Sequence, residues 1–121
     1  MFSFTQKITP FVKQEIALAR VSRLKGDVNA EFSHLENAHV LGQESTYHHV
    51  KVHYLMLLWG FRQKRLAEVM GQMFRIFGAL TKTMLGLVPQ GNTGGSNISP
   101  FKRLPLKPEL ANIINQAKNN V

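Results

Sequence analysis

The stretch that decides the fold is Ser45–Gln63, STYHHVKVHYLMLLWGFRQ, because its apolar residues recur on every side of a helix. These residues are Val50, Val52, Leu55, Met56, Leu57, Leu58, Trp59 and Phe61. Such an all-round pattern is typical of a helix enclosed by others. Ser45 or Thr46 can cap its amino end. The sequence therefore predicts a central, largely buried helix that ends near Gln63.

Three further helices flank this one. Thr9-Pro10 is a typical helix start, and Gly26 ends the apolar pattern that follows. Asp27 can cap a second helix that runs to about Leu41 and ends at Gly42. A fourth helix is predicted from about residue 66 to 85, with Gly86 as its end and with an apolar stripe of Val69, Met73, Ile76, Phe77, Leu80 and Met84. Because the connections are short, we expect an all-α, antiparallel four-helix bundle-like domain over residues 10–86.

The chain changes character after Gly86. Residues 89–97, PQGNTGGSN, are dense in turn formers, and the prolines in residues 99–108 oppose helix formation. We expect a loop and an extended strap over residues 87–108, then a short terminal helix over residues 109–118. The glycines could present N–H groups to an anion. They lack the Lys-Ser/Thr and the preceding strand of a phosphate loop, which favours a structural loop.

Composition limits the class of protein. With 121 residues, 44% of them hydrophobic, the chain is long enough for one domain, residues 1–121, with a single core. It has no cysteine, which excludes disulfides and thiolate ligands and fits a reducing cytoplasm. We expect no signal peptide and no transmembrane segment, because no apolar run is long enough. The predicted location is therefore cytoplasmic.

The formal net charge of +8 leaves an acidic partner or nucleic acid as an alternative function. The basic residues are scattered and are not interleaved with aromatic residues, so no base-stacking platform is indicated. Solvated helix ends account for them more simply. The oligomeric state is left open.

Two pairs of residues with metal-binding side chains lie on the second and third predicted helices. Glu36 and His39 are three positions apart, and His49 and His53 are four apart, so each pair shares one side of its helix. His39 and His49 lie about one turn from the connecting loop, and Glu36 and His53 lie about one turn further. In an antiparallel hairpin the four would be level. The spacing therefore predicts a divalent-metal site for zinc, iron, nickel or manganese.

A second interpretation is a buried hydrogen-bond network in which Glu36 orients a histidine and no metal binds. Gln72 and Arg75, with Glu68, mark a polar edge of the fourth helix. Gln72 and Arg75 could support the site, although a solvated edge is the simpler interpretation. By helical phase His34 and His48 point elsewhere and are expected at the surface. No nucleophile-elbow sequence or organic-cofactor motif is present, so no catalytic residue and no reaction can be assigned.

Four stretches of the sequence together resemble a known family. They are HLENAHVLGQ, HHVKVHYLML, GQMFRIFGALTKTMLGLVPQGNTGGSN and SPFKRLPL. The resemblance is to an uncharacterised bacterial domain-of-unknown-function family, numbered thirty-seven-zero-three, over about residues 10–112. It implies a small bacterial protein of this one domain, with family positions matching Glu36, His39, His49 and His53. It implies no activity.

Overall fold

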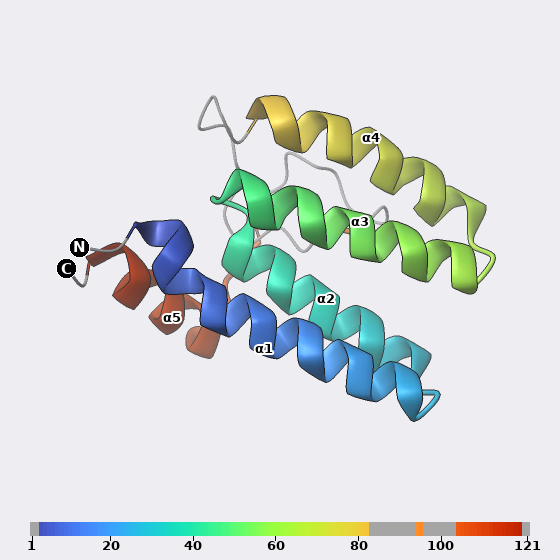
Figure 1. The fold of residues 1–121 in the computed structure, drawn as a ribbon, viewed down its shortest axis with the longest axis horizontal. Helices are drawn as coiled ribbons and strands as arrows, with labels where there is room; N and C mark the ends of the chain where they lie inside the picture. Colours follow the sequence, from blue (N-terminus) through green and yellow to red (C-terminus); the bar gives the residue numbers. More distant parts are fainter. Residues whose placement is uncertain (1–2, 83–93, 96–103, 120–121) are drawn as a thin grey trace.

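Five helices make up nearly all of the described chain. The computed structural model describes residues 3–82, 94–95 and 104–119 (Figure 1). The helices are α1 (Phe4–Leu24), α2 (Val28–Gly42), α3 (Thr46–Arg62), α4 (Leu66–Lys82) and α5 (Pro108–Asn119). Within those residues there is no strand, which confirms the predicted all-helical class, and the packing of the helices is consistent with a bundle. No helix in this part of the chain is long and apolar enough to cross a membrane.

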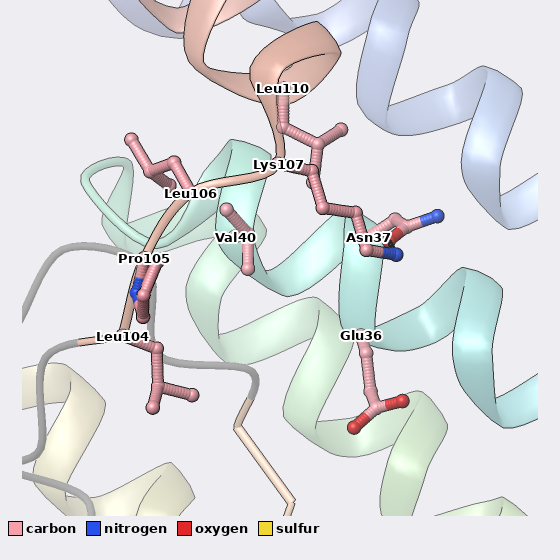
Figure 2. A pocket seen from close by; sticks show the side chains of 8 residues that line it. All are labelled: Glu36, Asn37, Val40, Leu104, Pro105, Leu106, Lys107 and Leu110. Atoms are coloured by element: carbon pink, nitrogen blue, oxygen red, sulfur yellow. Dashed lines mark hydrogen bonds between the residues drawn. The ribbon is translucent and has the colours of Figure 1, made fainter.

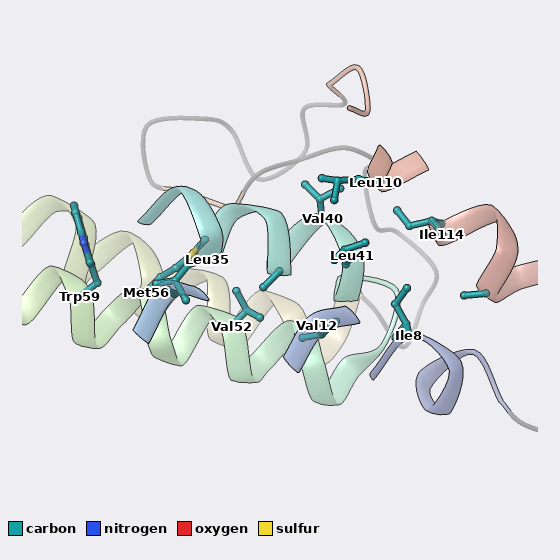
Figure 3. Close-up of a cluster of buried hydrophobic side chains, with 13 residues drawn as sticks. Ile8, Val12, Leu35, Val40, Leu41, Val52, Met56, Trp59, Leu110 and Ile114 are labelled. Atoms are coloured by element: carbon teal, nitrogen blue, oxygen red, sulfur yellow. The ribbon is translucent and has the colours of Figure 1, made fainter. Parts of the chain in front are cut away.

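The four long helices lie in the order α1, α2, α3, α4 across the molecule (Figure 1). α5 packs against α1 and α2. The main apolar core lies between α1, α2, α3 and α5, where Val12, Leu41 and Val52 are almost completely buried (Figure 3). Among the described helices, α4 packs against α3 alone, and none of its residues belongs to this core.

The predicted start of the first helix was wrong. α1 begins at Phe4, where the Ser3 hydroxyl accepts a hydrogen bond from the Gln6 backbone and the Gln6 side chain accepts one from Ser3. This capping box, Ser-x-x-Gln, was the signal in the sequence. Pro10 lies inside the helix on its exposed side, and the Thr9 hydroxyl donates back to the Thr5 carbonyl instead of capping.

The other helix ends follow the sequence more closely. Gly26 has a φ of +76°, directly after the end of α1, and the Asp27 carboxylate accepts from the Ala30 backbone at 3.0 Å. α5 matches the predicted terminal helix. α4 is described as far as Lys82, so the predicted end at Gly86 lies outside the described residues. So does most of the predicted loop and strap; residues 104–107 contain no helix.

The expectation that the third helix is the central and most buried one was only partly correct. α3 does lie between α2 and α4, and Val52, Met56 and Trp59 are buried. On its outer side, however, Tyr47 and Tyr54 are more than half exposed. The carboxyl-terminal half of α2 is more enclosed, because residues 38–43 are all buried.

The turn between α2 and α3 depends on a close contact at Gly42. A Cβ atom at this position would lie 2.7 Å from the Cβ of His48, which is closer than two non-bonded carbon atoms normally approach. The φ of Gly42 is not positive, so the glycine is required here by space and not by backbone conformation. His48 itself is buried, which corrects the expectation that it lies at the surface.

Gly42→Ala should therefore destabilise the fold. Alanine is favoured over glycine inside a helix by about 1 kcal/mol, but overpacking against His48 should cost more, with a net loss of about 1–3 kcal/mol. Chemical denaturation of both proteins measures the difference. An unchanged or raised midpoint would mean that helix propensity dominates and that His48 does not restrict this position.

Candidate metal centre

Three buried histidines meet where α2 and α3 are joined by their short turn. His39 is in the last turn of α2, His49 is in the first turn of α3, and His53 follows one turn later. His39 and His53 are each 2% exposed and His49 is 7% exposed. The i, i+4 spacing puts His49 and His53 on one side of α3, and this side faces His39 of α2, as predicted from the sequence.

The three imidazole rings form a nearly regular triangle. Ring centroids are 5.0 Å apart for His39 and His49, 4.7 Å for His39 and His53, and 4.8 Å for His49 and His53. Each ring offers one nitrogen to a group in which all ligand atoms lie within 4.8 Å of one another. The Nε2 atoms of His39 and His53 are 3.1 Å apart. This geometry could hold a metal ion.

Gln72 of α4 fixes the proton on His53. The Gln72 Nε2 atom donates to a Glu68 carboxylate oxygen at 2.5 Å and to the Gly94 carbonyl at 2.9 Å, so its Oε1 atom faces His53. An amide oxygen only accepts hydrogen bonds, so the Nδ1 atom of His53, 2.5 Å away, must be the donor. Neutral His53 then carries its lone pair on Nε2, directed toward His39.

Gly94 lies directly against the ring of His39. A Cβ atom at Gly94 would lie 2.5 Å from His39 Cδ2, and its φ of +87° is one that only glycine adopts easily. The sequence predicted a glycine-rich loop here, but it did not predict that the loop contacts the histidines. Gly94 and Gly95 are buried; the other residues of the loop, and hence the anion-binding alternative, lie outside the described part of the chain.

Glu36, the fourth predicted ligand, is not a member of the histidine group. It is partly exposed and lines a pocket of about 140 Å³ between α2 and residues 104–107. Figure 2 shows Leu104 and Pro105 beside Val40, while the Glu36 carboxylate extends from α2. The Lys107 ammonium donates to Asn37 at the same pocket, at 2.9 Å. Ligation by Glu36 therefore stays a prediction.

The polar edge of α4 faces inward, which corrects the solvated edge expected from the sequence. Gln72 is completely buried and Arg75 is 8% exposed, whereas Met73, Phe77 and Leu80 of the predicted apolar stripe are exposed. Burial lowers the pKa of the Arg75 guanidinium, and the nearby Glu68 carboxylate opposes that shift. α4 thus presents its polar side to the histidines, and Gln72 contacts His53. A supporting role of Gln72 and Arg75 at a metal site stays a prediction.

The two remaining histidines lie outside the cluster. His34 is partly exposed and lies 3.3 Å from a Glu15 carboxylate oxygen. His48 packs under α1, where its Nε2 atom lies 2.8 Å from the Thr9 hydroxyl. Because the Thr9 hydroxyl donates to Thr5, His48 Nε2 is the donor in this contact. Burial lowers the pKa of His48, and Lys51 and Lys13 add to the shift.

Fold and site together define a small helical protein with a buried tri-histidine cluster between two helices, supported by an amide from a third. The chain belongs to the family described as protein of unknown function (DUF3703), whose model matches residues 6–114. This confirms the family resemblance seen in the sequence. No curated protein and no solved structure matches the chain.

Gly94→Ala should disturb the cluster through His39. The variant combines an unfavourable φ with a methyl group placed against the imidazole, so we expect a loss of stability of more than about 2 kcal/mol. Gly26→Ala is the matched control, because Gly26 has a φ of +76° but no neighbour within 4 Å of the added Cβ. Thermal unfolding of both variants isolates the contact with His39. Equal losses would mean that this contact contributes nothing.

Proposed function

We propose that this protein binds a divalent metal ion through His39, His49 and His53. The observation that carries the proposal is the convergence of three buried imidazoles on one point, with their ligand nitrogens within 4.8 Å of one another. Imidazole is a common metal ligand in proteins, and burying three such rings together is costly unless each polar nitrogen has a partner.

The hydrogen bonds around His53 support metal binding in particular. Histidine ligands usually donate their second ring N–H to an oxygen acceptor, which fixes the tautomer and aims the lone pair at the metal. The His53–Gln72 contact has this form. Tetrahedral zinc with Zn–N bonds of about 2.0–2.1 Å requires nitrogens about 3.3 Å apart. The 3.1 Å between His39 and His53 is close to this value, and His49 would complete the set by moving inward.

Three neutral imidazoles favour zinc, nickel or iron over manganese, which prefers oxygen ligands. Glu36 would add a carboxylate and make manganese a better fit. With three protein ligands a fourth position stays open to water or another small ligand.

The alternative without metal is a histidine network in which His39 Nε2 donates to His53 Nε2. It accounts for the same 3.1 Å contact and predicts that added metal has no effect on the wild type. Binding of an acidic partner or nucleic acid, expected from the net charge of +8, also stays a prediction. So does the cytoplasmic location, which rests on the cysteine-free sequence.

Zinc or nickel should raise the melting temperature of the untagged protein. At a free metal concentration about 100 times Kd the stabilisation is about 2.7 kcal/mol. The shift should shrink near about pH 5, because ligand imidazoles must lose their protons to bind. His39→Ala and His53→Ala should abolish the shift. Differential scanning calorimetry with and without metal, followed by chelator, measures it.

His34→Ala is the control for these variants, because His34 lies outside the cluster, and it should retain the full shift. Glu36→Gln tests the fourth ligand: weaker binding assigns the carboxylate to the site, and unchanged binding leaves a three-histidine centre. If no divalent metal changes the melting temperature of the wild type, the metal proposal fails and the hydrogen-bond network is correct.

Gln72→Leu should weaken metal binding about 10–100-fold, since the leucine cannot accept from His53 Nδ1 and the ring loses its fixed tautomer. Competition with a chromogenic chelator measures the zinc Kd. Gln116→Leu, an exposed glutamine on α5, is the control. Equal affinity of Gln72→Leu and wild type would show that His53 does not need this acceptor.

A further inference from the structure

The outer face of α4 carries a continuous apolar seam. Its residues follow the spacing four, three, four, three along the helix, and each is between 46% and 73% exposed: Leu66, Met70, Met73, Phe77 and Leu80. This is the spacing of the a and d positions in a coiled coil, where the side chains of two helices interdigitate in knobs-into-holes packing. We refer to these five residues as the α4 seam.

The positions beside the α4 seam are also apolar. Ala67 and Phe74 are exposed on one side, and Phe74 is 65% exposed. On the other side Ile76 and Leu80 line a groove of about 460 Å³ together with Tyr47 and Tyr54 of α3. Folded monomers seldom expose an apolar patch of more than a few hundred Å². A patch of this extent indicates a contact surface.

We propose that the α4 seam is a dimer interface that pairs with the same seam of a second copy of this chain. The repeat is self-complementary, as the interface of a two-fold dimer must be. A large apolar side chain has an accessible area on the order of 200 Å² when it is fully exposed, and these side chains are about half to three-quarters exposed. The seam, Phe74 and the two tyrosines then offer close to the roughly 800 Å² per partner of a standard interface.

Charge favours a second copy over a lipid surface. Helices that lie on membranes carry many lysines and arginines along their polar face. Between Leu66 and Leu80 the only charged residues are Glu68 and Arg75. Arg75 is buried, and Glu68 bonds to the buried Gln72 on the side toward α3. The five seam residues therefore carry no positive charge for an anionic headgroup. Lys51 lines the adjacent groove, over the Tyr47 ring, and Arg65 precedes the first seam residue.

Met73 provides the sharpest test, because it is the central residue of the seam. A parallel two-fold pairing brings the two Met73 side chains together, and so does an antiparallel pairing whose axis passes through the centre of the seam. Met73→Glu and Met73→Lys each place like charges at this point. Both substitutions are at a 57% exposed position of the protomer, so its fold should be preserved.

Sedimentation equilibrium at about 100 µM protein, above the micromolar Kd of ordinary weak dimers, should give wild type twice the chain mass of 13.7 kDa. Met73→Glu and Met73→Lys alone should each give the single-chain mass. An equimolar mixture of the two should restore the doubled mass, because opposite charges then meet. Circular dichroism confirms that each variant is folded, and Phe77→Asp, at a 71% exposed position, provides a second disrupting variant.

Leu24→Glu is the matched control, since Leu24 is an exposed apolar residue at the end of α1, and this variant should stay dimeric. A wild type of single-chain mass would overturn the proposal, as would a dimer that both Met73→Glu and Phe77→Asp leave intact. Co-sedimentation of a monomeric wild type with anionic vesicles, lost in Met73→Glu, would instead make this face a membrane contact. All of these results are expected without added metal, because Gln72 already holds the inner side of α4 through its hydrogen bond with His53.

Discussion

The hydrogen bond between the His53 ring and the Gln72 amide is the contact on which the placement of α4 depends. Among the described helices α4 touches only α3, and it contributes nothing to the main apolar core. Leaving a buried polar group without its hydrogen-bond partner costs about 1–3 kcal/mol. The His53–Gln72 pair, completed by Glu68 and the Gly94 carbonyl, therefore holds the inner side of this helix in one register. These bonds join α3, α4 and the Gly94 backbone, and the contact between His39 and His53 adds α2.

This arrangement explains why the amphipathic fourth helix is turned with its apolar side outward. Its polar residues are needed beside His53, where an apolar face would leave ring nitrogens without partners. The large apolar residues then fall on the opposite side of the helix, as the 57% exposed Met73 and the 71% exposed Phe77 show. The cost of exposing them is recovered only if another surface covers them.

Features set by residues close together in the sequence could be predicted, whereas contacts between distant segments could not. The three histidines could be predicted to meet, because two helical spacings and one short turn fix their relative positions over 15 residues, His39 to His53. The outward orientation of the apolar stripe on α4 could not be predicted. A hydrophobic pattern shows which residues share one face of a helix, but not whether that face contacts the rest of the protein. The contact of Gly94 with His39 was not predicted for a similar reason. The two residues are 55 positions apart, and the loop sequence does not indicate which side chain packs against it.

A metal ion at the histidines and a partner on the α4 seam would act on opposite sides of one helix. An ion held by the Nε2 atoms of His39 and His53 would keep the proton of His53 on Nδ1, which donates to Gln72, and would make the inner side of α4 harder to displace. A helix held in one register presents its outer residues at fixed spacing, which the interdigitation of a coiled coil requires. The polar side of α4 would thus position the helix, and its apolar side would bind the second copy.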